Sequence, residues 1–542
     1  MSFIDTIFSH LAQAQERPLV VEMHGSEARP FSRGQVARWV AHARAVLLEA
    51  GVKAGDRVVL VAPNSAKWVA ADLAALAAGA VVVPMYARQD PGELVEMIVD
   101  CEPSLVVVVD EVLGRRLTDA GAGVEQRTFS DLFDSERAPC EQAPSAREPD
   151  EAVTIVYTSG TSGVPKGVVL SCGNVDHMLP VTRDALIAMM GPREQADRVF
   201  HYLPFCFAGS RVVLWTCLFR GNPIHVSTNI DNLGAELAAA APNYALNVPM
   251  LLERIKNKVE AGVLSRGAAI AGLYRQARDA WMRTARGEAR VGDGLLVALG
   301  SVVLFGSIKK KIGPNLDCLI CGSAPLGEAT QRWFEMLGIP VYQVYGLTET
   351  TAIVTMDVPP AVVPGRVGRA ISGVEMKISD ESELLVRGPN VFQGYWKRPD
   401  ATDAAFLDGW FRTGDQVELR DGSLRIVGRV KNILVPTSGH NVAPEPIERQ
   451  IVETIEGVEQ AVLVGHGRAS VGALVTGAFT DEGLQQGIDR INEGLPHYRR
   501  VRAWRRASEP FTIENGLLTA NRKLRRTVIE KHFVEIIEEM YQ

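Results

Sequence analysis

Hydrophobic residues in the first part of the chain form short runs separated by helical patterns. The runs Arg57–Ala62 (RVVLVA), Ala80–Met85 (AVVVPM) and Leu105–Asp110 (LVVVVD) are continuous rather than alternating, which is typical of strands covered on both faces. Between them, Ala66–Ala78 and Leu94–Cys101 carry apolar residues at helical spacing. This alternation of strand and helix predicts right-handed crossovers and a doubly wound, mainly parallel α/β sheet.

The pattern changes twice further along the chain. A polar stretch, 135–150, precedes a strand expected over Ala152–Tyr157, and the proline-rich segment 358–366 (VPPAVVPGR) precedes short strand-like runs with tight turns. The last part again alternates strands with helices and ends in an amphipathic helix expected over Lys523–Tyr541.

These patterns predict the domain organisation. We expect an N-terminal domain over residues 1–430, built from stacked α/β subdomains with mainly parallel sheets plus a small β subdomain. We expect a small α+β C-terminal domain over residues 431–542.

The amino-acid composition excludes several classes of protein. The 542 residues include 57 Lys or Arg against 64 Asp or Glu, a net charge of −7, and 46% are hydrophobic. These values exclude a disordered chain and a protein that binds nucleic acid by bulk positive charge. The seven cysteines are scattered, and Cys318 and Cys321 lie in an apolar run, so they are expected to be buried in a strand rather than to bind zinc. With no secretory signal at the start, these features predict a cytoplasmic protein.

One basic segment leaves two interpretations open. Leu252–Arg290 holds nine Lys or Arg against four Asp or Glu, and the longest apolar run, Leu295–Ile308, follows it. That run is shorter than the ~20 residues of a spanning helix, so a buried or interfacial element is expected. A solvated helix face is the favoured interpretation, and peripheral membrane contact through residues 252–308 is the other.

The strongest chemical signal is Thr158–Gly167, TSGTSGVPKG, directly after a predicted strand. Glycines allow backbone N–H groups to approach an anion, hydroxyls donate hydrogen bonds, and Lys166 adds positive charge, as expected of a loop that binds phosphates. It is not a Walker loop, because Lys166 is followed by Gly167 and Val168 rather than by Ser or Thr.

Two further clusters carry suitable chemistry. Gly322–Leu326 (GSAPL) is a tight turn after a strand, and Tyr345–Thr350 (YGLTET) offers an aromatic ring, hydroxyls and the Glu349 carboxylate. Near a triphosphate, that carboxylate is expected to act as a Mg²⁺ ligand, since like charges otherwise repel. In GWFRTGD, Asp415 can accept hydrogen bonds from vicinal hydroxyls such as those of a ribose.

Taken together, TSGTSGVPKG, GSAPL, YGLTET, FRTGD and GRVKN resemble, in order and spacing, the acyl-adenylate-forming (AMP-binding) synthetases. The resemblance runs from about Ser32 to Arg526. The segment Gly439–Glu448 (GHNVAPEPIE) and the basic insertion are similar to the long-chain fatty acyl-CoA synthetase branch. The resemblance implies a ligase that uses ATP, Mg²⁺ and coenzyme A. It would activate a medium- or long-chain fatty acid to acyl-AMP and transfer the acyl group to coenzyme A.

The resemblance also implies roles for individual residues. The nucleotide would contact three groups of residues: Thr158, Ser159, Gly160, Thr161, Ser162, Gly163 and Lys166 at the phosphates, with Thr348 at the α-phosphate; Gly322, Ser323, Ala324, Pro325 and Tyr345 at adenine; and Asp415 with Arg429 at the ribose. Gly346 is implied as a further nucleotide-binding position. The segment LTANRKLRR implies Lys523 as the adenylation lysine, acting with Lys166, Thr348 and the Mg²⁺ ligand Glu349.

The remaining implied positions concern motion and the acyl chain. Lys431 matches a hinge about which the small domain turns, and Gly439 lies in a loop expected to face coenzyme A in the second step. Phe205 and Phe207 are acyl-pocket candidates. Phe207 and Ser210 stand where the long-chain branch usually has His and Glu, which bears on chain-length preference.

Two alternatives stay open from the sequence. An enzyme of the same fold could deliver the acyl group to a carrier protein or to cyclisation instead of coenzyme A. A non-catalytic lipid- or nucleotide-binding homologue is the second alternative, although Lys166, Glu349, Asp415, Arg429 and Lys523 are all retained. The sequence does not indicate an oligomeric state.

Overall fold

The computed structural model describes residues 2–134, 138–159, 165–192, 195–519 and 523–541. The chain divides into two compact units, and it passes between them more than once. The first contains residues 1–376, 386–411 and 421–424, and the second contains 377–385, 412–420 and 425–542. A single domain boundary after residue 430 stays a prediction.

The first unit contains a seven-stranded sheet whose central strands are parallel. Its order is β18 (Gly394–Tyr395), β8 (Pro165–Ser171), β7 (Ala152–Ser159), β4 (Val81–Met85), β3 (Arg57–Val61), β5 (Leu105–Val108) and β6 (Gln126–Thr128). Only β8 and β18 pair antiparallel with their neighbours, and β7 and β8 form a hairpin. The valine-rich strands β3, β4 and β5 are almost wholly buried, as their continuous apolar runs predict.

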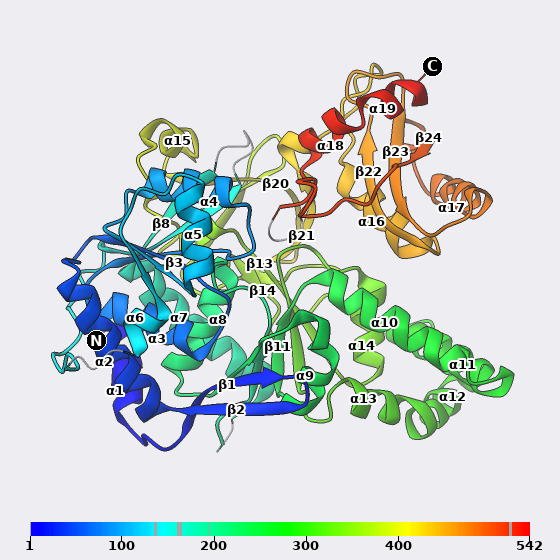
Figure 1. Cartoon of the computed structure of the whole chain (residues 1–542). Helices are drawn as coiled ribbons and strands as arrows, with labels where there is room; N and C mark the ends of the chain where they lie inside the picture. The colour runs from blue at the N-terminus through cyan, green and yellow to red at the C-terminus, as the bar shows by residue number, and fades with distance from the viewer. Residues whose placement is uncertain (1, 135–137, 160–164, 193–194, 520–522, 542) are drawn as a thin grey trace. The chain divides into compact units, whose positions relative to one another are not determined.

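A nine-stranded sheet forms the other half of the unit (Figure 1). Its order is β15 (Arg369–Ala370), β14 (Thr355–Met356), β13 (Val341–Tyr345), β12 (Cys318–Cys321), β11 (Tyr244–Asn247), β9 (Val199–His201), β10 (Ile224–Ser227), β1 (Pro18–His24) and β2 (Glu27–Ser32). The six strands from β13 to β1 run parallel, and the outer strands β14, β15 and β2 pair antiparallel with their neighbours.

Helices cover and separate these sheets. The helix α3 (Ala66–Ala77) contacts β3 and β4 of one sheet and β1 of the other, so it lies in the layer between them. On the other face of the seven-stranded sheet lie α4 (Pro91–Cys101) and α5 (Glu111–Asp119) (Figure 1). The other helices here are α1 (Phe3–Ala12), α2 (Arg33–Glu49), α6 (Phe129–Phe133), α7 (Cys172–Met190), α8 (Ala208–Phe219), α9 (Leu233–Ala240), α14 (Glu328–Met336) and α15 (Pro399–Ala404).

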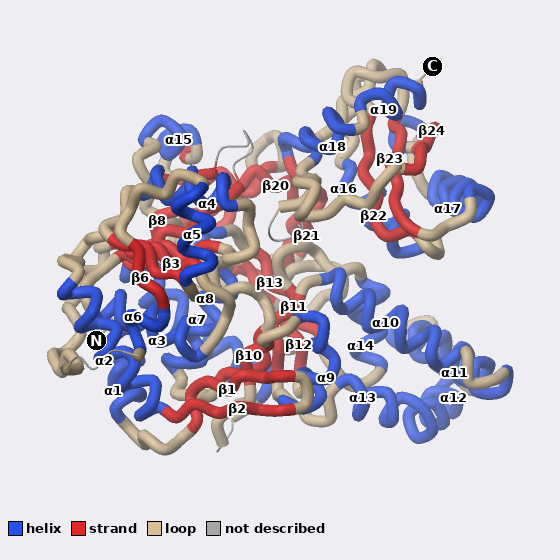
Figure 2. The backbone as a smooth tube through the Cα atoms, in the orientation of Figure 1, coloured by secondary structure: helices blue, strands red, loops and turns tan. Residues whose placement is uncertain are grey.

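A helical insertion connects β11 to β12. We call residues 249–312 the arm. It contains α10 (Pro249–Leu264), α11 (Ala268–Ala285), α12 (Asp293–Gly300), the π-helical turn η2 (Ser301–Phe305) and α13 (Gly306–Ile312). In Figure 2 these helices project together from one end of the sheet.

The second unit has a three-stranded sheet in the order β22 (Val458–Val464), β23 (Val471–Gly477) and β24 (Val501–Arg506). Its apolar core is formed with α16 (Pro444–Thr454) and α17 (Asp481–Glu493) on one side, and with α18 (Arg526–His532) and α19 (Val534–Met540) on the other. A further sheet has the order β16 (Glu375–Ile378), β17 (Glu383–Arg387), β20 (Trp410–Arg420) and β19 (Phe406–Leu407), with β21 (Ser423–Arg429) paired to β20.

The predicted fold class is confirmed: the chain is a mixed α/β protein with mainly parallel large sheets and a small α+β part. Cys318 and Cys321 are buried in β12, as expected. One local prediction was wrong, because the expected helix over Lys523–Tyr541 is two helices. They meet at Phe533, whose ring packs on Phe511 in the core, so burying that ring takes precedence over helical continuity.

Candidate nucleotide and acyl site

The predicted phosphate loop is the connection of the β7–β8 hairpin. Across this hairpin Thr158 pairs with Lys166, and Ser159 pairs with Pro165. The hairpin therefore holds the two ends of the loop close together. Gly160, Thr161, Ser162 and Gly163 lie outside the described residues.

Lys166 and Glu349 are brought together through a residue that the sequence motifs do not reveal. The Lys166 Nζ atom lies 5.0 Å from the ring centroid of Tyr395, and the Tyr395 hydroxyl donates a 2.9 Å hydrogen bond to Glu349 Oε1. Burial, and then the charge of Glu349, raise the pKa of Tyr395 well above its usual range, so the hydroxyl stays a donor. The only signal was an aromatic pair, Tyr395-Trp396, following Gly394.

The position of Tyr395 follows from strand pairing. In β18, Tyr395 pairs with Val168 of β8, two residues beyond Lys166, so the ring and the lysine lie on adjacent strands. Glu349 belongs to the 3₁₀ turn η3 (Thr348–Thr350), and its carbonyl accepts a 2.8 Å bond from the Phe392 N–H. Three segments that are distant in sequence, β8, η3 and β18, therefore bring a cation, a carboxylate and a phenol close together.

The two adenine-site candidates lie at the same edge of the nine-stranded sheet. The turn Gly322–Pro325 follows β12, and Tyr345 ends β13, and these strands are parallel neighbours. Gly346 allows the chain to turn sharply, because a Cβ there would lie 2.2 Å from the Ala352 carbonyl oxygen. The turn and the tyrosine thus follow or end neighbouring strands, and their contact with adenine stays a prediction.

A buried polar network connects the end of this turn to the neighbouring strand β13. Its sequence signal is a lone glutamine in VYQVY. Gln343 Oε1 accepts a 2.7 Å bond from the Leu326 N–H, and Gln343 Nε2 donates to Gln331 Oε1 at 2.9 Å. The Gln343 N–H donates to Asp357 Oδ2 at 2.9 Å. Burial raises the pKa of Asp357 to about 7, although the hydrogen bonds from the Gln343 N–H and the Gln331 side chain lower it.

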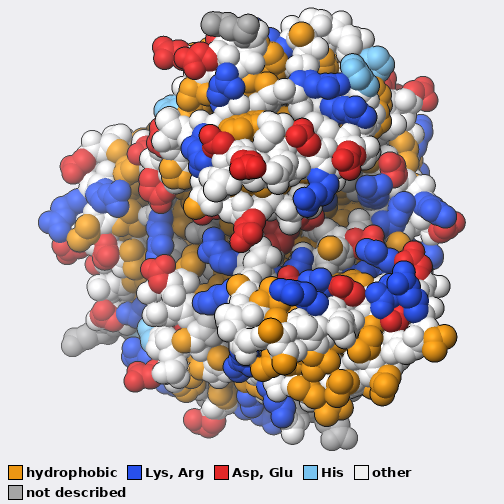
Figure 3. Space-filling model, turned by 90° about the vertical axis from the view of Figure 1, so that its right-hand side faces the viewer, with side chains coloured by type: hydrophobic (Ala, Val, Ile, Leu, Met, Phe, Trp, Pro, Cys, Tyr) orange, Lys and Arg blue, Asp and Glu red, His pale blue; other side chains and the backbone are white. Residues whose placement is uncertain are grey.

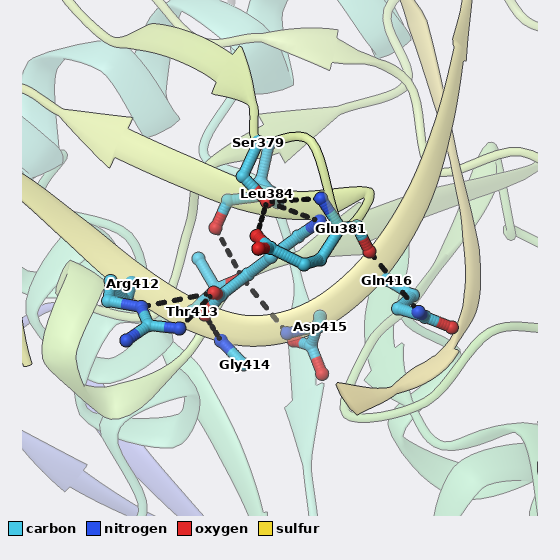
Figure 4. Close-up of polar contacts among 9 residues, drawn as sticks. Ser379, Glu381, Leu384, Arg412, Thr413, Gly414, Asp415 and Gln416 are labelled. Carbon is cyan, nitrogen blue, oxygen red and sulfur yellow. Dashed lines mark hydrogen bonds and ion pairs between the residues drawn. The ribbon is translucent and has the colours of Figure 1, made fainter. Parts of the chain in front are cut away.

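The ribose candidates Asp415 and Arg429 form a pair within the second unit. Arg429 Nε lies 2.8 Å from Asp415 Oδ1, and the carboxylate is almost wholly buried. Figure 4 shows how β20 is held: the Thr413 hydroxyl donates to the Leu384 carbonyl at 2.8 Å, and the Asp415 N–H donates to the Thr413 hydroxyl at 3.1 Å. Glu383 anchors the same strand, accepting bonds from Arg412 and from the Gly414 N–H.

Three other predicted positions of the second unit, Lys431, Gly439 and Lys523, lie in different local structures. Lys431 lies in a 3₁₀ turn, η4 (Val430–Asn432), immediately after Arg429. Gly439 adopts a positive φ of 76° in an open loop where a Cβ would touch nothing within 4 Å. Lys523 is exposed, and its backbone forms reciprocal hydrogen bonds with Thr519.

The two acyl-pocket candidates differ in burial. Phe205 is wholly buried, with its ring 5.0 Å from Trp68 and 5.2 Å from His201. Phe207 is half-buried, precedes α8, and lies 6.3 Å from the ring of Tyr86. Of the two, only Phe207 therefore has a surface that a bound chain could touch without displacing core side chains.

The residues present fit a Mg²⁺ ion bound mainly by its substrate. Mg²⁺ in phosphate sites commonly takes one or two protein carboxylates plus phosphate oxygens and water. Among the described residues no group of three or more His, Cys, Asp or Glu side chains could hold a metal by itself. Glu349, with one oxygen bonded to Tyr395, is the carboxylate suited to such a partial ligand set.

No helix within the described ranges has both the length and the apolar character needed to cross a membrane.

Comparison with known proteins identifies the family. The sequence model of the AMP-binding enzyme family matches residues 8–396, and that of the AMP-binding enzyme C-terminal domain matches residues 431–542. The chain is 30% identical to the long-chain-fatty-acid–CoA ligase FadD15 of Mycobacterium bovis, with 91% of this chain and 89% of that protein aligned. It is 27% identical to human long-chain-fatty-acid–CoA ligase 6, with 89% and 78% aligned.

A solved structure agrees on the fold. The adenylation domain of a carboxylate reductase from Mycobacterium chelonae has a TM-score of 0.78 to this chain at 21% identity, covering 100% of this chain and 91% of that one. The family matches span most of the sequence and include the loop, turn and strand-end motifs described above. This chain is therefore a member of the AMP-binding enzyme family.

Proposed function

We propose that this protein is an acid–thiol ligase that activates a medium- or long-chain fatty acid with ATP and transfers it to coenzyme A. The observation that carries the proposal is the cluster of Lys166, Tyr395 and Glu349 beside the hairpin loop, in a chain whose relatives are named long-chain-fatty-acid–CoA ligases. The cluster supplies a cation for phosphate oxygens and a carboxylate, bonded by the Tyr395 hydroxyl, for Mg²⁺.

In the first step, a carboxylate oxygen of the fatty acid attacks the α-phosphorus of ATP. The bond from that phosphorus to the bridging oxygen breaks, and pyrophosphate leaves with the electron pair, which gives acyl-AMP. Lys166 and the hairpin loop bind the β- and γ-phosphates, Thr348 binds the α-phosphate, and Lys523 offsets charge that develops between two anionic reactants. Mg²⁺ supplies further charge neutralisation when bound.

Nucleotide contacts assigned to the other motifs complete this step. The turn Gly322–Pro325 and Tyr345 bind the two faces of adenine, and Asp415, oriented by Arg429, accepts hydrogen bonds from the ribose hydroxyls. The Gln343 network keeps the adenine turn rigid, because each of its amide groups is bonded in a buried setting.

In the second step, the thiolate of coenzyme A attacks the acyl carbonyl, and AMP leaves with the electrons of the carbon–oxygen bond. We infer that the C-terminal domain, 431–542, rotates about Lys431 between the steps, withdrawing Lys523 and presenting the Gly439 loop. Lys431 suits a hinge, because it lies in a short 3₁₀ turn between a strand and a loop.

The decisive experiment separates the two half-reactions in the Lys523→Ala variant. Fatty-acid-dependent ATP–pyrophosphate exchange is expected to fall about 100- to 1000-fold, because a preorganised charge at the reacting oxygen is lost. Thioester formation from supplied acyl-AMP is expected to change little. The matched control is Lys531→Ala, which removes another exposed lysine of the same unit. Equal loss of both half-reactions would contradict the two-pose assignment.

Tyr395→Phe tests the cluster itself. This change removes the hydroxyl that bonds Glu349 but keeps the ring beneath Lys166. We expect exchange to fall about tenfold, the usual loss for one hydrogen bond to a charged group. The Mg²⁺ concentration for half-maximal rate should rise as well.

A second tyrosine of the chain provides the matched control for this variant. The Tyr274 hydroxyl also donates to a carboxylate, Glu260 Oε1, at 2.8 Å, but it lies in the arm, away from the hairpin loop. Tyr274→Phe should therefore leave the Mg²⁺ dependence of exchange unchanged. A shift of the same size in both variants would contradict the role assigned to Tyr395.

The acceptor and the acid are tested together. A pyrophosphate-release panel from short to very long acids, with and without coenzyme A, identifies the preferred chain length. Acyl-AMP that accumulates although coenzyme A is present would favour the alternative, delivery to a carrier protein or to cyclisation. Absence of acid-dependent pyrophosphate release across the panel would favour a non-catalytic binding protein.

A cytoplasmic location and peripheral membrane contact through residues 252–308 belong to the same proposal. The contact is consistent with a helical arm rather than a spanning segment in this part of the chain.

A further inference from the structure

The arm carries a strongly apolar face that the rest of the first unit leaves uncovered. The run from Asp293 to Ile312 is helical throughout, and no residue between 294 and 308 is charged. Five large side chains project outward from or just before it, with exposed fractions of 109% for Val291, 77% for Leu295, 46% for Leu299, 84% for Val302 and 49% for Val303. We call these five residues the apolar face of the arm.

The opposite side of the helical run 293–312 packs in the core, and this packing keeps the apolar face of the arm exposed. Leu304, Phe305 and Ile308 are buried in the same core as Tyr274 and Ala277 of α11. At the crossing of α11 and α12 a Cβ added to Gly300 would lie 2.5 Å from the Ala277 Cβ, so the two helices are in close contact. The run therefore cannot roll to bury Leu295 or Val302 without removing its other side from the core.

The concentration of exposed apolar residues is unusual for this chain. Eighteen large hydrophobic side chains are exposed among the described residues, and five of them lie between positions 291 and 303. Single exposed hydrophobic residues need no explanation, but a contiguous patch marks an interaction surface. On the side of the molecule seen in Figure 3, hydrophobic side chains gather in the lower part, with Lys and Arg side chains beside them.

Charge indicates what this surface meets. The arm holds twelve Lys or Arg against five Asp or Glu, although the whole chain has a net charge of −7. Lys310 and Lys311 are exposed at one end of the apolar run, and Arg286 and Arg290 are exposed at the other, together with Glu288. Asp293 adds no free negative charge, because it is buried and held by Arg283 at 2.5 and 3.0 Å.

We propose that the apolar face of the arm docks on an anionic lipid bilayer, with the flanking cations on the lipid phosphates. An apolar helix face bounded by Lys and Arg is the arrangement that lies in the plane of a membrane interface. The choice of lipid over another anionic partner rests on the proposed function, since a long-chain fatty acid partitions into bilayers and the arm would hold the enzyme at that source.

A second copy of the chain fits this surface less well. A symmetric dimer through the apolar face would bring the same cationic flanks of two arms together, with Glu288 as the exposed carboxylate nearest in sequence to compensate them. A bilayer that contains anionic lipid satisfies both the apolar face and the cations at once.

Vesicle flotation tests the proposal with the full-length protein. We expect binding to vesicles of phosphatidylcholine with phosphatidylglycerol, weaker binding to phosphatidylcholine alone, and a loss of binding at high salt. The double variant Leu295→Asp/Val302→Asp should lower the partition coefficient at least about 100-fold, because it places two charges in the apolar layer. Lys310→Gln/Lys311→Gln should lower it about 30-fold.

A matched control and an activity assay make the result unambiguous. Val99→Asp/Val112→Asp changes two valines that are 61% and 60% exposed on α4 and α5, and it should bind vesicles like the unaltered protein. Pyrophosphate exchange with a water-soluble medium-chain acid should be unchanged in every one of these variants, so failure of the enzyme and failure of docking are distinguishable. The proposal is overturned if the unaltered protein does not bind anionic vesicles, or if the Leu295 and Val302 changes leave binding intact. It is also overturned if the unaltered protein is a dimer that does not bind vesicles, and sedimentation shows that the Leu295→Asp/Val302→Asp variant is a monomer. The apolar face would then be a dimer interface.

Discussion

The helix α3 and the run α12–η2 are both built from small and apolar residues, yet the fold uses them in opposite ways. In α3 every residue except Lys67 is buried, because the helix lies between two sheets. In α12–η2 one face enters the core, and the other exposes Leu295 and Val302. Apolar composition therefore identifies a helix that avoids water on at least one side, and the number of layers around it decides whether the other side becomes core or interaction surface.

Charged side chains also lie in different environments in the two regions. The acidic residue inside α3, Asp72, is wholly buried, and it is bonded by Arg211 at 2.8 Å and by the indole of Trp215 at 3.0 Å. In the arm the cations lie at the ends of the apolar run, in water. A buried layer accepts a charge only with its partner, whereas a surface face simply excludes it.

The largest effect is expected from breaking the buried pair. Asp72→Ala leaves the Arg211 guanidinium unpaired at 1% exposure, so we expect the free energy of unfolding to fall by about 3–5 kcal/mol. Urea titration followed by the fluorescence of the buried tryptophans measures it. Asp279→Ala on the exposed side of α11 is the control and should cost less than about 0.5 kcal/mol. A loss below about 1 kcal/mol for Asp72→Ala would mean that the pair does not stabilise the buried layer.

A second buried carboxylate sharpens the comparison, because Asp357 is bonded by amide groups and its pKa is raised to about 7. The folded protein therefore keeps a proton that the unfolded chain releases near pH 4, and the stability this group contributes at low pH is lost as pH rises from about 4 to about 7. Asp357→Asn removes this loss, and at pH 8 the variant should be more stable by on the order of 3 kcal/mol. Thermal unfolding at pH 5 and pH 8 checks it, and an identical pH dependence in both proteins would contradict it.

Packing density should also separate the two helices. Ala74→Leu inserts a larger side chain into the middle of α3, where Ala74 is wholly buried, so we expect a loss of about 1–3 kcal/mol. The same change at exposed Ala298 of α12 should cost less than about 0.5 kcal/mol. Both are read from the midpoint of urea unfolding. Similar losses at both positions would show that α12 is as enclosed as α3.

The smallest effect on stability is expected at the apolar face of the arm. Leu295→Asp should change the free energy of unfolding by no more than about 0.5 kcal/mol, because the side chain is 77% exposed and touches little of the core. Differential scanning calorimetry without lipid is the measurement. A loss of about 2–5 kcal/mol, as for truncating a core leucine, would show that Leu295 is buried in solution.

Several elements could be predicted because their signal is local. The runs that became β3, β4 and β5 are nearly all valine, and continuous apolar runs of that length have few uses other than a sheet covered on both faces. The hairpin with Lys166, the turn after β12 and the tyrosine at the end of β13 lie in short motifs whose glycine, proline and hydroxyl residues each favour turns for a local reason.

Other features could not be predicted for a physical reason. Tyr395 joins Lys166 and Glu349 only because β18 pairs with β8 across more than 200 residues of sequence, and nothing near Tyr395 reports that pairing. The same is true of Gln343, Gln331 and Asp357, whose roles depend on bonds between a strand, a helix and a loop. The prediction of a single helix at the end of the chain was wrong, because the burial of Phe533 depends on tertiary packing against Phe511.

The sequence by itself determined the fold class, the family and the chemistry of the motifs, since these follow from local periodicity and from residue types that few other structures need. Only the tertiary structure decided which apolar surfaces are enclosed and which polar groups meet. Both depend on contacts between distant segments, and neither the hydrophobic effect nor a hydrogen bond carries information about its partner's place in the chain. That is why α3 and α12–η2 look alike as sequence and differ as structure.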